Sequence, residues 1–233
     1  MAGSLADGCL ERQLASEIEA AAGQGVPAIR RFGAGSRQID FRLPCGSGID
    51  VLIDPAPDRD ACRRAVAALD DRRCASLPLP GAPDGLAVRH FIPPLRLLVF
   101  GEGPEQGALL HLAAAAGVTV ELPGRDMAIG EAPAGYPVDP WTAIVLLYHD
   151  HEWERPLLRW ALTTPAFLIG AQGGARTRAQ RLEQLSADGS GAADLARISS
   201  PIGLIPRSRE PLVLALSVLA EIVGHYERLH PHG

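Results

Sequence analysis

The sequence predicts an α/β protein, with a Rossmann-like parallel-sheet domain in its C-terminal half and a smaller α/β domain before it. Three observations carry this prediction. Short apolar runs of strand length recur after residue 94, helical patterns separate them, and glycine-rich turns follow several of the runs. Short apolar strands that alternate with amphipathic helices are typical of a parallel sheet covered by helices.

Length and composition exclude several classes of protein. The chain has 233 residues, of which 47% are hydrophobic, and this is enough for a real core. A net charge of -5 without a block of like charges argues against nucleic acid and anionic membranes as partners. The sequence has neither a signal-peptide pattern nor an apolar run of membrane-spanning length, so we expect a cytoplasmic protein.

The first 80 residues predict a small α/β domain. Residues 11–22 form an amphipathic pattern that ends at two glycines, which predicts a helix. Strand-like pieces at 41–43 and 49–53 flank a glycine-rich turn, and residues 59–69 predict a second helix. Proline and glycine are frequent from residue 76 to 94. We therefore expect a linker at 81–94 and a second domain at 95–233.

The second domain alternates strands and helices. We expect strands at 95–100, 118–121, 143–148 and 166–170, and helices at 105–116, 155–162, 176–185 and 212–229. In an open parallel sheet, the loops at the carboxyl ends of the strands meet in one crevice, where ligands bind. This selects three loops, at 101–105, 149–151 and 170–174.

The first loop carries Gly101 and Gly103, the two leading glycines of a dinucleotide fingerprint. Gln106 stands at the third glycine position, and Glu102 and Glu105 bring negative charge, which repels a phosphate at contact distance by roughly 1 kcal/mol in water. The pattern therefore fits either a phosphate-binding turn or a plain connection between a strand and a helix.

The second loop contains His149, Asp150 and His151. Imidazoles can bind a metal, donate to a phosphate or move protons, and the aspartate can cap the next helix or orient an imidazole. No third metal ligand stands out. The alternative is one exposed histidine and one histidine packed beneath a helix.

The third loop offers Gly170, Gly173 and Gly174, followed by Arg176 at the start of a helix. Backbone amides with an arginine suit a phosphate or a carboxylate. A solvated basic helix face is the alternative, and it is at least as strong for Arg178 and Arg181, which follow in the same helix.

Cysteine spacing indicates neither a zinc site nor a redox pair, because no CxxC occurs among Cys9, Cys45, Cys62 and Cys74. Cys45, beside Gly46 in a glycine-rich turn, could present a thiolate to a soft metal. A buried structural cysteine is the alternative.

Seven segments, taken in order, resemble the XdhC/CoxI family of accessory factors for molybdenum hydroxylases. They are GCLE at 8–11, LPCGSGIDVLI at 43–53, FGEGPE at 100–105, YHDH at 148–151, IGAQGGART at 169–177, PIGL at 201–204 and ALSVLAEI at 215–222. The resemblance covers nearly the whole chain. It begins at the equivalent of the family's GGCVE element, so we expect an N-terminal domain that is shortened at its start.

The resemblance implies a homodimeric chaperone and favours a cofactor-binding protein over an enzyme. Such a protein binds the molybdenum cofactor (molybdopterin), protects it during sulfuration by a cysteine desulfurase, and delivers it to the apo-enzyme of a xanthine dehydrogenase or a related hydroxylase. By the same resemblance, Cys45 and Cys9 would contact the metal, and Cys45 would lie near the mouth of the crevice. The three residues 149–151 and the two glycine loops would line the pocket.

The chain departs from the family pattern at Glu102, Gln106, Gly174, Ala175 and Ile205. Two other functions therefore stay open. One is an NAD(P)-dependent oxidoreductase, for which only Glu121 is available at the ribose position. The other is a family member that has lost its ligand and acts through protein partners.

Overall fold

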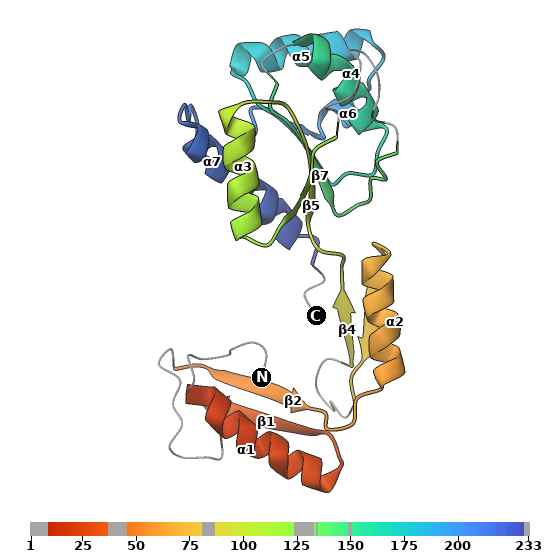
Figure 1. Ribbon diagram of the computed structural model, residues 1–233, viewed down its shortest axis with the longest axis vertical. Coiled ribbons are helices and arrows are strands. Elements are labelled where there is room, and N and C mark those ends of the chain that lie inside the picture. The colour runs from red at the N-terminus through yellow and green to blue at the C-terminus, as the bar shows by residue number, and fades with distance from the viewer. Residues whose placement is uncertain are drawn as a thin grey trace. The chain divides into compact units, whose positions relative to one another are not determined.

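The computed structural model describes residues 9–36, 46–80, 87–123, 133, 135–148 and 151–230. The chain divides into two compact units, Met1–Phe91 and Ile92–His232. Figure 1 shows helices and strands in both units, and the predicted α/β class is confirmed. Among the described residues, no helix is both long and apolar enough to cross a membrane.

The N-terminal unit contains two small antiparallel sheets. Its elements are α1 (Cys9–Gln24), β1 (Ala28–Gly33), β2 (Gly48–Ile53), α2 (Arg59–Asp70), β3 (Ala75–Pro78) and β4 (Val88–Phe91). Strand β1 pairs with β2, and β3 pairs with β4. The two predicted helices and the strand at 49–53 are present.

The sequence did not predict every strand of this unit. Strand β2 pairs with β1, and the strand-like piece expected at 41–43 lies outside the described residues. Strand β1 escaped prediction because Arg30 and Arg31 interrupt its apolar pattern. Strand β4 lies within the predicted linker 81–94. It pairs with β3, but three of its four residues are exposed, so it has no buried apolar run that the sequence could reveal.

The C-terminal unit is a five-stranded parallel sheet with helices on both faces. Its elements are β5 (Arg96–Phe100), α3 (Pro104–Ala115), β6 (Thr119–Glu121), β7 (Thr142–Leu146), α4 (His151–Leu162), β8 (Leu168–Ala171), α5 (Ala175–Ala187), α6 (Ala192–Leu195), β9 (Ile198–Ser199) and α7 (Pro211–Glu227). The strand order is β6-β5-β7-β8-β9. After β5 the chain forms β6 on one side of β5 and then crosses to form β7 on its other side. The topological switch point therefore lies between β5 and β7.

Alternation along the central strands builds a core on each face of the sheet. Leu97 and Val99 of β5 pack with α3 and α7, whereas Leu98 and Phe100 pack with α4 and α5. Strand β7 alternates in the same way. Because successive side chains of a strand point to opposite faces, strands buried on both faces become continuous apolar runs, and this explains why they could be predicted.

Arg96 clamps the amino-terminal edge of this sheet. Its guanidinium donates to the Pro137 carbonyl oxygen at 2.5 Å and to the Thr142 hydroxyl at 3.0 Å, and it pairs with the carboxylates of Asp139 at 3.2 Å and Glu121 at 3.4 Å. The side chain is only 9% exposed. One buried arginine thus fixes the start of β5, the end of β6 and the segment before β7.

Gly101 permits a close approach between the ends of β5 and β7. Its φ is +139°, and a Cβ there would lie 2.9 Å from the Leu147 carbonyl carbon. We expect Gly101→Ala to destabilise the protein by about 2 kcal/mol, because both the backbone and the contact are unfavourable for alanine. Gly107→Ala is the matched control, since that helical position has open space and alanine should stabilise it by roughly 0.5–1 kcal/mol. Thermal denaturation of both variants tests these two expectations, and equal melting temperatures would contradict them.

Candidate functional site

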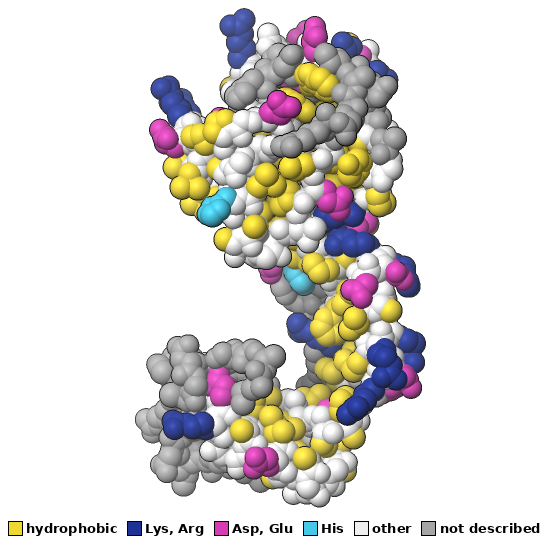
Figure 2. Space-filling view, in the orientation of Figure 1, with side chains coloured by type: hydrophobic (Ala, Val, Ile, Leu, Met, Phe, Trp, Pro, Cys, Tyr) yellow, Lys and Arg dark blue, Asp and Glu magenta, His cyan; other side chains and the backbone are white. Residues whose placement is uncertain are grey.

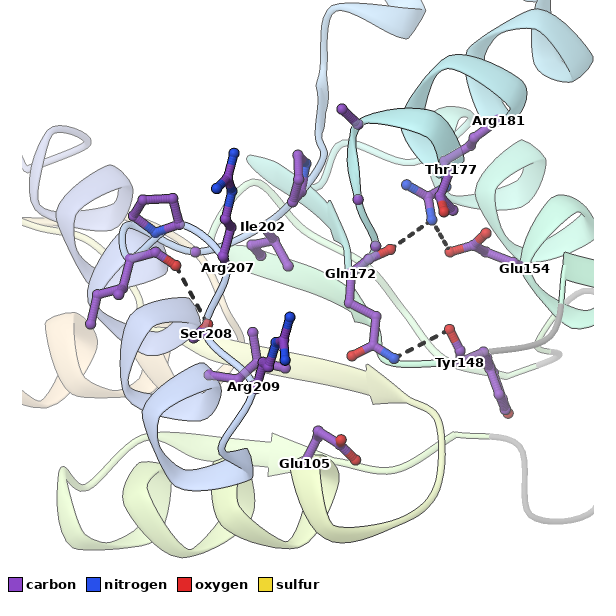
Figure 3. Close-up of a pocket in the computed structure, with 18 residues that line it drawn as sticks. Glu105, Tyr148, Glu154, Gln172, Thr177, Arg181, Ile202, Arg207, Ser208 and Arg209 are labelled. Atoms are coloured by element: carbon purple, nitrogen blue, oxygen red, sulfur yellow. Dashed lines mark hydrogen bonds and ion pairs between the residues drawn. The ribbon is translucent and has the colours of Figure 1, made fainter.

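A cavity of about 830 Å³ lies at the carboxyl edge of the parallel sheet. Its walls come from the loops after β8 and β9 and from the beginnings of α3, α5 and α7 (Figure 3). It is lined by Glu105, Tyr148, Glu154, Gln172, Gly173, Gly174, Ala175, Thr177, Arg181, Pro201, Ile202, Gly203, Ile205, Pro206, Arg207, Ser208, Arg209 and Leu214.

Hydrogen bonds draw the ends of β5, β7 and β8 together at this edge. The Leu147 amide donates to the Phe100 carbonyl oxygen at 2.7 Å. The Gln172 side chain, which is buried, donates from Nε2 to the Leu147 carbonyl oxygen at 2.9 Å. The expectation that the Gly101 and Gly170 loops lie at one edge is therefore correct for the described parts of these loops.

A buried ion pair forms the floor of the cavity. Arg181 Nη2 lies 2.5 Å from Glu154 Oε1, and the two side chains are only 3% and 4% exposed. The same nitrogen donates to the Gln172 carbonyl oxygen at 2.8 Å (Figure 3). Nη1 donates to the Ser200 hydroxyl. Arg181 therefore connects α4, α5 and the loops after β8 and β9, so the solvated helix face, the alternative left open for this residue, is wrong. Arg178 is exposed, in line with that alternative.

Helix α7 holds the opposite wall in place. The Glu221 carboxylate accepts hydrogen bonds from the Ser199 hydroxyl and from the Gly203 amide, the latter at 2.5 Å. The Ser217 hydroxyl accepts from the Ile205 amide at 2.6 Å. Two polar side chains of one helix thus fix the segment 199–205, which explains why the PIGL and ALSVLAEI motifs occur together.

Part of the cavity lining suits an anion. Helix α5 begins there after Gly173, with φ +133°, and Gly174, the N-cap residue, which provides no side-chain capping hydrogen bond. Helix N-termini attract negative charge through their amides and dipole. Arg207 and Arg209 add two cationic side chains to the lining. Arg207 adopts a φ of +61°, a conformation that is unfavourable for a side chain of this size.

Other residues at this edge are acidic or aromatic. Glu105 lines the cavity, and Tyr148 stacks on Trp153 with ring centroids 5.8 Å apart. Burial, together with the negative charge of Glu102, raises the pKa of Tyr148, so its phenol is neutral at physiological pH. Gln106, at the missing third glycine position, donates to the Gly101 carbonyl oxygen at 2.6 Å. This loop is thus closed by a side chain of its own helix.

Some predicted site residues lie outside the described parts of the chain. Cys45, His149 and Asp150 do so entirely, and Cys9 and His151 are the first residues of α1 and α4, with side chains that are not described. Among the described residues, no group of three or more potential metal ligands occurs. The metal-ligand assignments for Cys45 and Cys9 therefore stay predictions.

The remaining predicted site residues differ in whether they line the cavity. Gly173 and Gly174 line the cavity, whereas Gly101, Gly103 and Gly170 shape the edge without lining it. A Cβ at Gly170 would lie 2.0 Å from Ile202 Cδ1, so this glycine allows a cavity residue to approach β8. The other two predicted residues stand elsewhere: Arg176 is exposed and does not line the cavity, and Gly46 is exposed in the N-terminal unit.

Sequence reasoning missed the charged residues that define the cavity. Arg181 precedes the buried Leu185 by one helical turn, so helical spacing alone places it on the buried face of α5. Arg207 and Arg209 stand in a segment that was assigned to no element. The sequence feature that could have indicated them is the position of two arginines between the PIGL motif and the last helix.

Comparison with known proteins identifies the family. The XdhC Rossmann domain model matches residues 97–222. The "Molybdenum cofactor insertion chaperone PaoD" of Escherichia coli (strain K12) is 30% identical over 243 residues, which cover 98% of this chain and 74% of that protein. A crystal structure described as a xanthine dehydrogenase from Bacillus halodurans has a TM-score of 0.70 and 17% identity, over 97% of this chain and 83% of the other. This last likeness shows the fold alone. By its family model and its curated relative, the chain belongs to the XdhC Rossmann domain family.

Proposed function

We propose that this protein is an accessory factor that binds the molybdenum cofactor and assists its insertion into a molybdenum enzyme. The single observation that carries the proposal is the cavity of about 830 Å³ at the carboxyl edge of the sheet, where α5 begins and two arginines stand. The 30% identity to a molybdenum cofactor insertion chaperone over 98% of the chain supports it.

The lining residues fit the chemical groups of this cofactor. Its phosphate would be held by the first turn of α5 and by Arg207 and Arg209, which can form charge-assisted hydrogen bonds. Its flat pterin ring, rich in donors and acceptors, would lie toward Gln172 and Tyr148. When bound, the cofactor supplies a redox-active molybdenum centre for the enzyme that receives it. The residues of this chain bind and orient it and keep it from water.

Cys45 is our proposed ligand on the metal side, with Cys9 as a second candidate. The thiolate is a soft ligand that suits molybdenum. We expect Cys45→Ala to lower affinity for the molybdenum cofactor, whereas Cys74→Ala, at an exposed position, serves as the control and leaves affinity unchanged. We further propose a molybdenum hydroxylase of the xanthine dehydrogenase type as the recipient and a cysteine desulfurase as a partner.

The oxidoreductase alternative would rely on Glu121 at the ribose position, and among the described residues this carboxylate already pairs with Arg96. Strand β6 ends at Glu121, which pairs with Leu98 of β5, two residues before the end of that strand. The Glu121 carboxylate lies 3.4 Å from the Arg96 guanidinium. A dinucleotide at the Gly101 turn would also meet Glu102 and Glu105. We therefore expect weak NAD(H) binding at best.

Calorimetric titration with isolated molybdenum cofactor tests the proposal. Arg207→Ala should weaken binding by about 10-fold, because one charge-assisted contact at a partly exposed site is lost. Arg178→Ala is the control, since this exposed arginine of α5 does not line the cavity, and it should bind like the unmodified protein. Arg176→Ala tests the position that the sequence favoured, and we expect a smaller loss there than at Arg207. Micromolar NAD(H) binding without any cofactor binding would favour the oxidoreductase.

A further inference from the structure

Two helices begin at the cavity, and they offer opposite chemistry to a ligand. Helix α5 begins after Gly174, which provides no side-chain capping hydrogen bond, so the first amides of this helix suit an anion. Helix α3 begins with Pro104, which has no amide hydrogen, and contributes Glu105 to the cavity lining. A ligand that fills the cavity therefore meets hydrogen-bond donors at α5 and a negatively charged acceptor at α3.

The Glu105 carboxylate is not explained by an anionic ligand alone. The side chain is half-buried, and among the described residues it has no hydrogen bond or ion pair, although Arg207 and Arg209 line the same cavity. An acidic side chain in the first turn favours the dipole of α3, but that role does not require a place in the cavity lining. Such a carboxylate repels a phosphate and attracts N–H donors. Its position indicates a ligand that carries both groups.

The two helix starts lie on opposite faces of the parallel sheet. Leu109 of α3 belongs to the core on one face, and Leu185 of α5 belongs to the core on the other. In Figure 3, Glu105 and Thr177 of α5 accordingly lie on different sides of the cavity. Acidic and basic side chains are intermixed on the face of the C-terminal unit that Figure 2 shows. No broad field of one sign selects the ligand on that face, so individual groups in the cavity matter.

We propose that Glu105 recognises the amino-pyrimidinone edge of the pterin ring and so determines which ring the cavity accepts. This inference rests on the proposed function. The edge carries two parallel N–H donors, one on the ring nitrogen and one on the 2-amino group, and a carboxylate can accept both through its two oxygens. A site built to pair with such donors discriminates against analogues that lack them. Glu105 is thus a specificity-determining residue, whereas the start of α5 and the two arginines hold the phosphate of any ligand.

Nucleoside monophosphates test this selection without the molybdenum cofactor. Guanosine monophosphate has the same amino-pyrimidinone edge and a phosphate, inosine monophosphate lacks only the 2-amino group, and adenosine monophosphate lacks the donor pair. In calorimetric titrations of the full chain, we expect guanosine monophosphate to bind about 10-fold more tightly than the other two. Guanosine monophosphate that binds no better than inosine monophosphate, or that does not bind, overturns the proposal.

Two glutamate variants separate direct recognition from net charge. Glu105→Gln should remove the preference for guanosine over inosine monophosphate, because an amide offers one acceptor and one donor in place of two acceptors. Glu102→Gln is the matched control, since it removes the same charge three residues earlier, at an exposed position that does not line the cavity. It should keep the preference. An equal change in both variants would mean that net charge alone is responsible, and the assignment to Glu105 would be wrong.

Isolated molybdenum cofactor distinguishes this inference from the proposed function. Glu105→Gln should weaken cofactor binding by about 10-fold, whereas Glu102→Gln should not weaken it. Circular dichroism melting should show that both variants are as stable as the unmodified protein. If Glu105→Gln binds the cofactor as tightly as the unmodified protein does, the inference is wrong and the proposed function stands. If the unmodified protein binds neither the cofactor nor guanosine monophosphate, both are wrong.

Discussion

Arg181→Ala is expected to destabilise the C-terminal unit by about 3–5 kcal/mol, because it leaves the Glu154 carboxylate buried without its cation. The substitution also removes the donors to the Gln172 carbonyl oxygen and the Ser200 hydroxyl. Chemical denaturation should show a lower midpoint with an unchanged slope. This is the largest single effect that we expect from a residue of the cavity.

A double variant separates the ion pair from the packing around it. Replacing a buried pair by apolar residues is often neutral, so Glu154→Leu combined with Arg181→Met should recover much of the stability that Arg181→Ala loses. The exposed pair of Arg63 and Asp60 on α2 is the control, and its loss should change stability by at most about 0.5 kcal/mol. An Arg181→Ala protein as stable as the unmodified chain would contradict the role of this pair.

Arg96→Ala is expected to lower the free energy of unfolding by about 3 kcal/mol. The partners that this arginine loses differ from those of Arg181. The guanidinium is 9% exposed and satisfies the Pro137 carbonyl oxygen, the Thr142 hydroxyl and the Asp139 carboxylate. Its removal takes a donor from the buried Thr142 hydroxyl and a cation from the half-buried Asp139 carboxylate, which still accepts from the Trp141 amide and the Thr142 hydroxyl at 2.9 Å each. A buried polar group that loses its partner is unfavourable by about 1–3 kcal/mol. Arg96→Lys should lose less, since it keeps the charge but not the planar fork.

Hydrogen exchange would locate the effect of Arg96→Ala. We expect faster exchange in β6 and at the start of β7, the two segments that the guanidinium connects, with little change in β8. Thermal denaturation provides the global measurement. Uniform acceleration across the whole sheet would mean that Arg96 stabilises the unit as a whole instead of clamping one edge.

The parallel sheet could be predicted from sequence because its strands are buried on both faces. After their first residues, strands β5 and β7 are continuous apolar runs, and glycines mark the turns that follow β5 and β8. Strand β9 escaped because only two residues, Ile198 and Ser199, pair with β8. A hydrophobic pattern cannot identify an element of that length.

The sequence predicted a crevice at this edge of the sheet, but it did not predict most of the charged residues that line the cavity. The glycine loop at 173–174 was identified because backbone amides at a helix N-terminus are a local property of sequence. Arg181 and Glu154 were not paired, because 27 residues separate them and only the packing of α4 against α5 brings them together. Arg176 and Arg181 look equivalent in sequence, yet helical spacing turns one to solvent and the other to the core.

Cations on the rim of the cavity and an ion pair in its floor respond differently to dissolved salt. Counter-ions screen exposed charges over about 8 Å at physiological ionic strength, whereas they reach a buried pair much less. The attraction of Arg207 and Arg209 for an anionic ligand therefore weakens as ionic strength rises, while the pair of Arg181 and Glu154 keeps the cavity's shape. A ligand held mainly at the rim can be displaced by a competing negative surface without any unfolding of the site beneath it.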